Sequence, residues 1–465
     1  MDMESIKRHF RRFGKRKQAD MTEGNIIRHL ITFAFPLFIG NIFQQLYNTV
    51  DTWVVGNYVS NEAFSAVGSV GPIINLLIGF FLGLSSGAGV VISQYYGAKK
   101  YDRVHDTVHT ALLMTIVMAV VFTGLGIAMV PFMLNFMKTP AEVIPEATTY
   151  LTIYFAGVIG LMIYNIGSGI LRAIGDSQRP FYFLVVSAVL NTILDLVFVI
   201  AFDMGVAGVA LATVIAQGVS AVLVLILMLR TDLCIKLIPR DLKMHWDMLA
   251  KIVRVGIPAA IQMAITSFSN IFVQSYINYF GADCMSGWTA YAKIDQFIFL
   301  PMQSLALAST TFVGQNLGVN QEERARKGAD TALYMAGALT VLIIIPILIF
   351  APGFVSFFND KPEVVEYGQM LLRYITPFYV VCTVNQVYSG ALRGAGNSTA
   401  PTVIMLISFV AVRQIYLFVM ANFIANEIIP IAMGYPLGWV VCSTSVFIYY
   451  KRTKLSKTRV VKDNE

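Results

Sequence analysis

The chain has 465 residues, of which 56% are hydrophobic and 13% charged, and it carries a net charge of +7. Soluble domains usually contain about 25% charged residues, so this composition excludes an ordinary soluble domain. The basic residues lie in short stretches between long apolar runs, where they set membrane orientation, and this distribution argues against a nucleic-acid partner.

Twelve apolar runs follow one another along the chain. Each has roughly twenty or more residues, the length that a helix needs to cross a bilayer core of about 30 Å. None alternates in the manner of a membrane β-barrel strand. The sequence therefore predicts an all-α membrane protein with twelve transmembrane helices, at 30–56, 64–93, 107–133, 147–171, 180–202, 206–229, 252–280, 286–312, 328–352, 366–392, 400–424 and 427–450.

The basic residues fall almost entirely on one side of these helices. If the N-terminus is cytoplasmic, 29 of the 34 Lys and Arg lie in the cytoplasmic segments, with Arg254, at the start of 252–280, counted with the linker. The opposite loops contain only Lys138 and Lys361, and Lys293, Arg373 and Arg413 lie within the helices. This asymmetry predicts a multi-pass protein of the plasma (inner) membrane with both termini in the cytoplasm.

The longest interruption between apolar runs divides the chain into halves of six helices each. It is basic and contains Pro239, which suits a linker. We therefore expect a basic cytoplasmic N-terminal segment (1–29), an N-lobe (30–229), a cytoplasmic linker (230–251), a C-lobe (252–450) and a basic cytoplasmic tail (451–465).

The two halves repeat each other. The segment SGILRAIGDSQRP (168–180) returns 221 residues later as SGALRGAGNSTAP (389–401), with seven of thirteen positions identical. Gln94 and Gln315 share this interval, and Pro36 precedes Pro258 by 222 residues. Because each unit has an even number of helices, both copies enter the membrane from the same side, so we expect two parallel repeats around a central cavity.

The repeated LRxxG segment lies at the expected cytoplasmic end of the fourth helix of each half. Gly175 and Gly396 fit a tight turn, so a structural hinge is the main interpretation. Gating through Arg172 or Arg393 is the alternative.

Ionisable residues inside a membrane are costly and are candidates for function. In 30–56, Asn41, Gln44, Asn48 and Asp51 share one helical face, and in 180–202, Asn191 and Asp195 share another. A rise of about 1.5 Å per residue puts Asp51, Asp195 and Thr213 in the outer half of the membrane, where they can meet.

Two carboxylates in one apolar pocket repel each other, and desolvation also favours their neutral form. Such a pair can take up a proton, or hold Na⁺ together with Asn and Thr oxygens, and each state favours a different arrangement of the lobe. The candidate cation-coupling residues are thus Asp51, Asn191, Asp195 and Thr213. The alternative is that each Asp is a hydrogen-bonded structural residue.

The second half keeps the scaffold without the acids. At the repeat interval Asp51 corresponds to Val273 and Asp195 to Tyr416, so the ion chemistry is expected in the N-lobe alone. The C-lobe has its own charges, Lys293, Asp295 and Arg413, which can form a salt bridge or serve the substrate or gating.

Other classes of activity are disfavoured. The sequence lacks a Walker A motif, so this chain does not power transport with ATP, and no nucleophile–base or metal constellation indicates an enzyme or a resident cofactor. A channel or sensor explains neither the repeat nor the paired acids.

Four segments together resemble the multidrug and toxic compound extrusion (MATE) transporters, in particular the DinF-like and MepA-like bacterial members. They are AFPLFIGNIFQQLYNTVDTWVVG (34–56), SGILRAIGDSQRP, VLNTILDLVFVI (189–200) and GVAGVALATVIAQ (205–217). The similarity extends from the first helix to the twelfth.

The resemblance implies an antiporter that expels small organic, often cationic, compounds in exchange for H⁺ or Na⁺, without another cofactor. It puts the family's N-lobe cation site on Asp51, Asn191, Asp195 and Thr213. A further family position, usually Asn, is Ser168 here, with Asn165 one turn earlier. We count Gln44, Asn48, Asn165, Ser168, Lys293, Asp295 and Arg413 as substrate or gating candidates.

The main rival is a flippase for lipid-linked oligosaccharides, which the same superfamily includes. A flippase cavity needs several cationic residues for a pyrophosphate, and only three lie within the helices here, which favours the exporter. The expected partners are organic substrates and the lipid bilayer, and the protein is expected to be a monomer.

Overall fold

The computed structural model describes residues 20–59, 61–137 and 139–461, and these are almost entirely helical. Lys138 and the ends of the two basic terminal segments, 1–19 and 462–465, therefore lie outside the described residues. The first half comprises α2 (Ile26–Tyr58), α3 (Asn61–Gly97), α4 (Tyr101–Phe136), α5 (Ile144–Ala156), α6 (Val158–Ala173), α7 (Gln178–Leu196), the π-helix η1 (Val197–Ala201) and α8 (Gly205–Arg230).

A linker with one short helical turn precedes the second half. Its elements are η2 (Pro239–Asp241) in the linker, then α9 (Trp246–Asn278), α10 (Ala282–Gly318), α11 (Glu322–Ile349), α12 (Ala351–Ser356), α13 (Pro362–Ile375), η3 (Thr376–Phe378), α14 (Tyr379–Gly394), α15 (Thr399–Met405), η4 (Leu406–Val412), α16 (Arg413–Val419), η5 (Met420–Ile424), α17 (Ile428–Ala432), α18 (Gly434–Arg452) and η6 (Leu455–Thr458).

Each predicted span coincides with one of these helices or with a run of short ones. Ten described helical segments are long and apolar enough to cross a membrane, and the pair α5 and α6, bent by 48° at Gly157, makes an eleventh. The remaining span, α13 to α14, which is the tenth in chain order, is divided by η3 into pieces of 14, 3 and 16 residues. The expected all-helical architecture of twelve membrane helices is confirmed.

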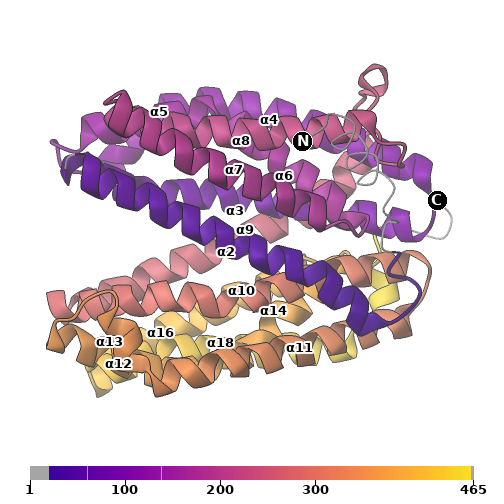
Figure 1. Ribbon diagram of the computed structural model, residues 1–465. Coiled ribbons are helices and arrows are strands. Elements are labelled where there is room, and N and C mark those ends of the chain that lie inside the picture. The colour runs from indigo at the N-terminus through magenta and orange to yellow at the C-terminus, as the bar shows by residue number, and fades with distance from the viewer. Residues whose placement is uncertain (1–19, 60, 138, 462–465) are drawn as a thin grey trace.

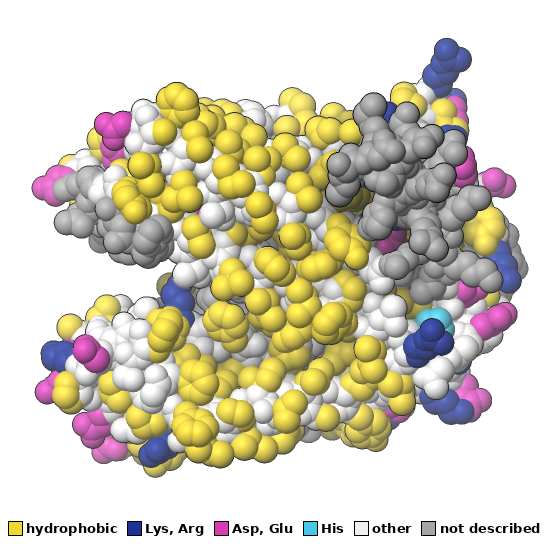
Figure 2. Space-filling model, viewed as in Figure 1, with side chains coloured by type: hydrophobic (Ala, Val, Ile, Leu, Met, Phe, Trp, Pro, Cys, Tyr) yellow, Lys and Arg dark blue, Asp and Glu magenta, His cyan; other side chains and the backbone are white. Residues whose placement is uncertain are grey.

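The helices form two bundles, an N-lobe of α2 to α8 and a C-lobe of α9 to η6 (Figure 1). The long helix α2 connects them, because its first turns pack on α10 and α11 of the C-lobe and its later turns pack on α7 of the N-lobe. A cleft separates the lobes at the end of the molecule opposite α2's first residue and α18's last (Figure 2). The cavity between the repeats thus opens at the predicted extracellular end.

Glycines bring the lobes into backbone contact beyond the floor of this cleft. A Cβ atom added at Gly87 of α3 would lie 2.5 Å from the carbonyl oxygen of Ile252 and 2.6 Å from the amide nitrogen of Gly256, both in α9. Gly83 is equally close to Ala260, one turn away along the same contact. Small residues permit such close approach of membrane helices, so α3 and α9 seal the predicted cytoplasmic half.

The repeated turns share one construction. Gly175 and Gly396 adopt φ values of +87° and +94°, the left-handed region that glycine enters without strain. The next residue then accepts hydrogen bonds from the helix that follows: Asp176 from the Gln178 and Arg179 amides, and Asn397 from the Ala400 amide. Asp and Asn are both good helix caps, so the difference between the copies preserves the turn.

Candidate functional site

Asp51 and Asp195 meet inside the N-lobe. Asp51 lies near the end of α2, and Asp195 lies in the last turn of α7, immediately before the π-helix η1. The charge of the Asp51 carboxyl acts on the Asp195 carboxyl, so the two groups lie close together. Asp195 is fully buried and Asp51 is half-buried. The structure therefore brings together the two acids that the sequence singled out.

Several polar atoms at this site have no partner among the described residues. They are Oδ1 of Asp51, both carboxylate oxygens of Asp195, and both side-chain polar atoms of Asn191. Asn191 is 2% exposed and precedes Asp195 by one helical turn. Buried polar groups normally have partners, so this cluster is incomplete by itself. A proton shared between the carboxyls, or a cation held by these oxygens, would satisfy it.

Two tyrosines lie near the acids, and a third stacks on one of them. The charge of Asp51 acts on the hydroxyls of Tyr47 and Tyr150, and that of Asp195 acts on Tyr150 as well. Tyr150 and Tyr154 are buried and stacked, with ring centroids 6.3 Å apart. The sequence interpretation missed these residues, although Tyr150 and Tyr154 are four apart in one span and so share a helical face.

The other candidates around this site divide into two groups. Asn48 and Gln44 lie on α2 about one and two turns before Asp51, and Gln44 lies beside the Tyr47 hydroxyl. Thr213 is buried in α8, which packs on α7, and its hydroxyl donates to the Val209 carbonyl at 3.0 Å.

Asn165 and Ser168 lie on α6, and the Asn165 backbone contacts α3. Both are buried, and the Ser85 hydroxyl of α3 donates to the Asn165 carbonyl at 2.7 Å. The Asn165 side chain donates to the Leu161 carbonyl in its own helix. Within the part of the chain that the structure describes, neither side chain hydrogen-bonds to the acids.

The repeat positions in the C-lobe are filled by apolar packing. Val273, which corresponds to Asp51, is fully buried in the C-lobe core. Tyr416, which corresponds to Asp195, donates its hydroxyl to the Pro430 carbonyl at 2.9 Å. The C-lobe therefore lacks a carboxyl pair at the positions equivalent to the N-lobe site.

Arg413 occupies a separate polar cluster in the C-lobe. It is 1% exposed, lies 4.5 Å from the ring centroids of Phe409 and Tyr435, and donates to the side chains of Ser269 and Asn270 at 3.1 and 3.3 Å. A guanidinium held between two aromatic rings and two acceptors is fixed in place, which favours a structural role over substrate contact.

Lys293 and Asp295 do not form an ion pair among the described residues. Lys293 is exposed on α10, whereas Asp295 is half-buried and its field acts on Tyr291 and Tyr435. Residues two apart on a helix point in nearly opposite directions, so the salt bridge between these two neighbours, one of the options from the sequence, is not made.

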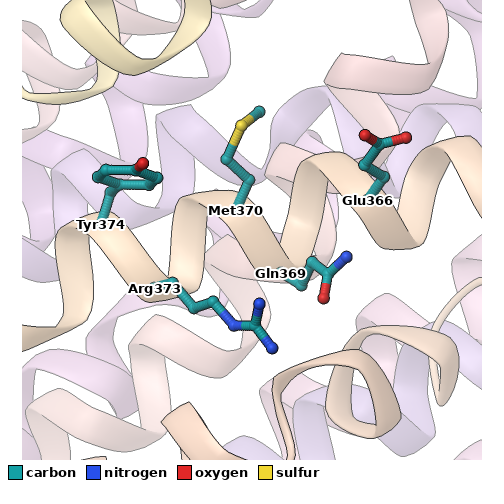
Figure 3. A pocket seen from close by; sticks show the side chains of 5 residues that line it. All are labelled: Glu366, Gln369, Met370, Arg373 and Tyr374. Carbon is teal, nitrogen blue, oxygen red and sulfur yellow. The ribbon is translucent and has the colours of Figure 1, made fainter.

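A shallow hollow of about 390 Å³ lies on α13, away from the carboxyl pair (Figure 3). Arg373 and Gln369 project from one side of the helix, and Met370, Tyr374 and Glu366 from the other. Arg373, one of the three basic residues within the predicted membrane helices, therefore lines this hollow. None of the candidate coupling residues lines it.

Comparisons with known proteins agree with the repeat. The family model MatE matches the chain twice, at residues 36–197 and 258–419, one match in each lobe. The chain is 30% identical to the probable multidrug resistance protein YpnP of Bacillus subtilis, over 94% of this chain and 97% of that protein. It is 25% identical to the probable multidrug resistance protein NorM of Thermotoga maritima, over 94% of each.

Among solved structures, the fold is similar to the outward-facing conformation of a multidrug resistance MATE transporter of the MOP superfamily. The TM-score is 0.87 at 22% sequence identity, and the match covers 94% of this chain and 97% of the other. This likeness concerns the fold.

Proposed function

Because the chain belongs to the MatE family of membrane transporters, we propose that it is an antiporter that exports small organic, often cationic, compounds and that cation binding at Asp51 and Asp195 drives the export. The family consists of transporters rather than enzymes. Multidrug resistance proteins among its relatives support the substrate class. The observation that carries the mechanism is the apposition of the buried Asp195 carboxyl and the half-buried Asp51 carboxyl in one lobe.

Electrostatics explain why such a pair couples to a cation. At a separation of about 4 Å and an effective dielectric constant of about 20, two unit negative charges repel each other by about 4 kcal/mol. The doubly ionised pair is therefore a high-energy state inside the lobe. Uptake of one H⁺ or one Na⁺ removes most of that repulsion, so occupied and empty sites favour different packings of α2 against α7.

Alternation between two openings turns this local change into transport. The cleft gives access to a substrate from the predicted extracellular end, while α3 and α9 close the opposite end. We propose that cation binding from outside and substrate release to the outside accompany this state. The reverse state, open to the cytoplasm, would take up substrate and release the cation.

The choice between H⁺ and Na⁺ depends on the ligands near the pair. The carboxyl oxygens and the Asn191 amide oxygen lack donors among the described residues and suit either ion. The Thr213 hydroxyl is engaged by its own helix as a donor but keeps acceptor capacity. We favour H⁺, because two apposed carboxyls can share one proton without any further ligand.

The flippase alternative is less well supported. Of the three cations within the membrane helices, Arg413 is buried and already bound by aromatic rings and side-chain acceptors. Only Lys293 and Arg373 are exposed, which is a weak cationic lining for a pyrophosphate. We further propose that the protein is a plasma-membrane monomer with both termini in the cytoplasm.

Resistance in a pump-deficient bacterial host tests the proposal. Asp195→Asn should reduce resistance to organic cations to that of the empty vector while the protein stays in the membrane. Asp232→Asn is the matched control, because the Asp232 side chain is 99% exposed in the linker. Full resistance conferred by Asp195→Asn would exclude the carboxylate mechanism.

A further inference from the structure

Two buried glutamines connect the lobes reciprocally at the closed end. Gln94 of α3 donates through Nε2 to the carbonyl of Gly394, the last residue of α14, at 2.9 Å. Gln315 of α10 donates in the same way to the carbonyl of Ala173, the last residue of α6, at 2.9 Å. Both glutamines are fully buried. Each bond therefore runs from a helix of one lobe to the repeated turn of the other.

The remaining amide oxygen of each glutamine binds a terminal segment of the chain. Gln315 accepts from the Met21 backbone amide at 3.1 Å. Gln94 accepts from the Val460 and Val461 backbone amides at 2.9 and 3.2 Å. Each glutamine thus hydrogen-bonds both to the opposite lobe and to a terminal segment of the chain.

The N-terminal segment is docked on the C-lobe. Met21 is fully buried in a cluster that includes Leu305 and Phe312 of α10. Its carbonyl accepts from the Asn316 and Arg324 side chains of the C-lobe at 3.1 and 3.2 Å. A segment that precedes the N-lobe in sequence is therefore fixed to the other lobe.

The C-terminal segment is docked on the N-lobe in a corresponding way. Glu322 of the C-lobe accepts from the Leu455 and Ser456 amides and so anchors η6. Five residues beyond Ser456, Val461 is buried in an N-lobe cluster that includes Tyr95 and Ile174. The two terminal segments thus cross between the lobes in opposite directions.

The helices that carry the glutamines also touch through glycine. A Cβ atom at Gly97 of α3 would overlap the Gln315 carbonyl, and one at Gly318 of α10 would overlap the Gln94 carbonyl. The two lobes are therefore in backbone contact where the glutamines bind. Separation of the lobes at this end would break both sets of hydrogen bonds and would withdraw Met21 or Val461 from its apolar cluster.

We propose that Gln94 and Gln315, together with the terminal residues Met21, Val460 and Val461, form a lock that holds the transporter in its outward-open state and must release before the cleft can open to the cytoplasm. This role rests on the alternating transport proposed above. The glutamines are positioning residues, because they touch neither the carboxyl pair nor the cleft. Their contribution is to the balance between the two states.

Distances between spin labels measure that balance without any transport assay. One label pair replaces Asp102 and Glu323, exposed residues in the first turns of α4 and α11 at the closed end. The second pair replaces Glu142 and Glu363, exposed residues at the open end. The four native cysteines are first replaced, and wild-type distances in lipid nanodiscs provide the reference.

The variants Gln94→Ala, Gln315→Ala and their combination test the lock. Each buried hydrogen bond lost changes the ratio of two states by roughly threefold to tenfold. The double variant should therefore raise the ratio of the long-distance to the short-distance population at the closed end by at least about tenfold. Gln303→Ala is the control, because Gln303 is an exposed glutamine on the same helix as Gln315.

Two further changes keep the test decisive if the double variant folds poorly. Gln94→Met keeps nearly the same side-chain length but has no N–H or O–H to donate to the Gly394 carbonyl, and removal of residues 459–465 takes away the tail. Each should produce the same shift in smaller degree, with faster amide exchange in residues 455–458 of the truncated chain. Unchanged closed-end distances in all these folded variants would overturn the lock, whether or not the protein exports drugs. A shift in a protein without export would support the lock and count against the proposed function.

Discussion

The contact between Gly87 and α9 gives the sharpest prediction about stability. In Gly87→Ala the added methyl group would lie 2.5 Å from the Ile252 carbonyl oxygen and 2.6 to 2.7 Å from backbone atoms of Gly256. Ordinary carbon contacts are about 3.5 to 4.0 Å, so α3 and α9 must move apart by about 1 Å. Both sides of the contact are backbone, and neither can yield by a change of rotamer.

Overpacking of this kind costs about 1 to 3 kcal/mol, and the higher helix propensity of alanine returns at most about 1 kcal/mol. We expect Gly87→Ala to lower the melting temperature of the detergent-solubilised protein by several degrees. Gly124→Ala is the control, because no atom lies within 4 Å of its added Cβ. Equal melting temperatures for Gly87→Ala and the wild type would refute the assigned backbone contact.

Three further predictions concern single side chains. Asn191→Leu removes the uncharged polar group beside the acids and should slow gradient-driven efflux by about tenfold at unchanged protein level. An unaltered efflux rate would show that Asn191 takes no part in the site. Arg413→Lys loses the planar stacking of the guanidinium on Phe409 and Tyr435 and should cost about 1 to 3 kcal/mol of stability. This loss should appear as a lower melting temperature, and an unchanged melting temperature would contradict the stacking. Asp176→Ala removes a helix cap and should lower the free energy of unfolding by about 1 kcal/mol, while Asp176→Asn keeps the cap and should lower it less. Equal losses of stability in the two variants would show that the ion pair with Arg179 matters instead.

The long apolar runs made the membrane helices predictable, because hydropathy decides where a chain can cross a bilayer. Breaks within the spans were harder to predict. The bend at Gly157 and the division of the tenth span at Thr376–Phe378 depend on how neighbouring helices pack. The π-helix η1, which follows Asp195, has no sequence signal in a single chain.

The meeting of Asp51 and Asp195 could be predicted because depth in a membrane follows from position along a helix. Depth does not show which way a side chain points around the helix axis. The prediction of the residues around the two acids was therefore weaker. Asn165 and Ser168 have a suitable position in the sequence, yet the Asn165 backbone faces α3. Tyr47 and Tyr150 were missed, because aromatic residues in an apolar helix usually face lipid or core.

The terminal segments were predicted only as basic cytoplasmic extensions. Their docking depends on backbone amides of Met21 and Val460, and a backbone group leaves no trace in the sequence. The partners Gln94 and Gln315 were noted as part of the repeat, but their function as bridges between the lobes required the fold.

Efflux from proteoliposomes tests cation coupling at the Asp51–Asp195 pair most directly. Purified protein is reconstituted with a fluorescent organic cation inside, and a pH gradient or a Na⁺ gradient is imposed separately. We expect one of these gradients to drive efflux, efflux to stop when the gradient is dissipated, and Asp195→Asn to abolish it. Equal efflux with and without both gradients, or full gradient-driven efflux by Asp195→Asn, would contradict cation coupling at the Asp51–Asp195 pair.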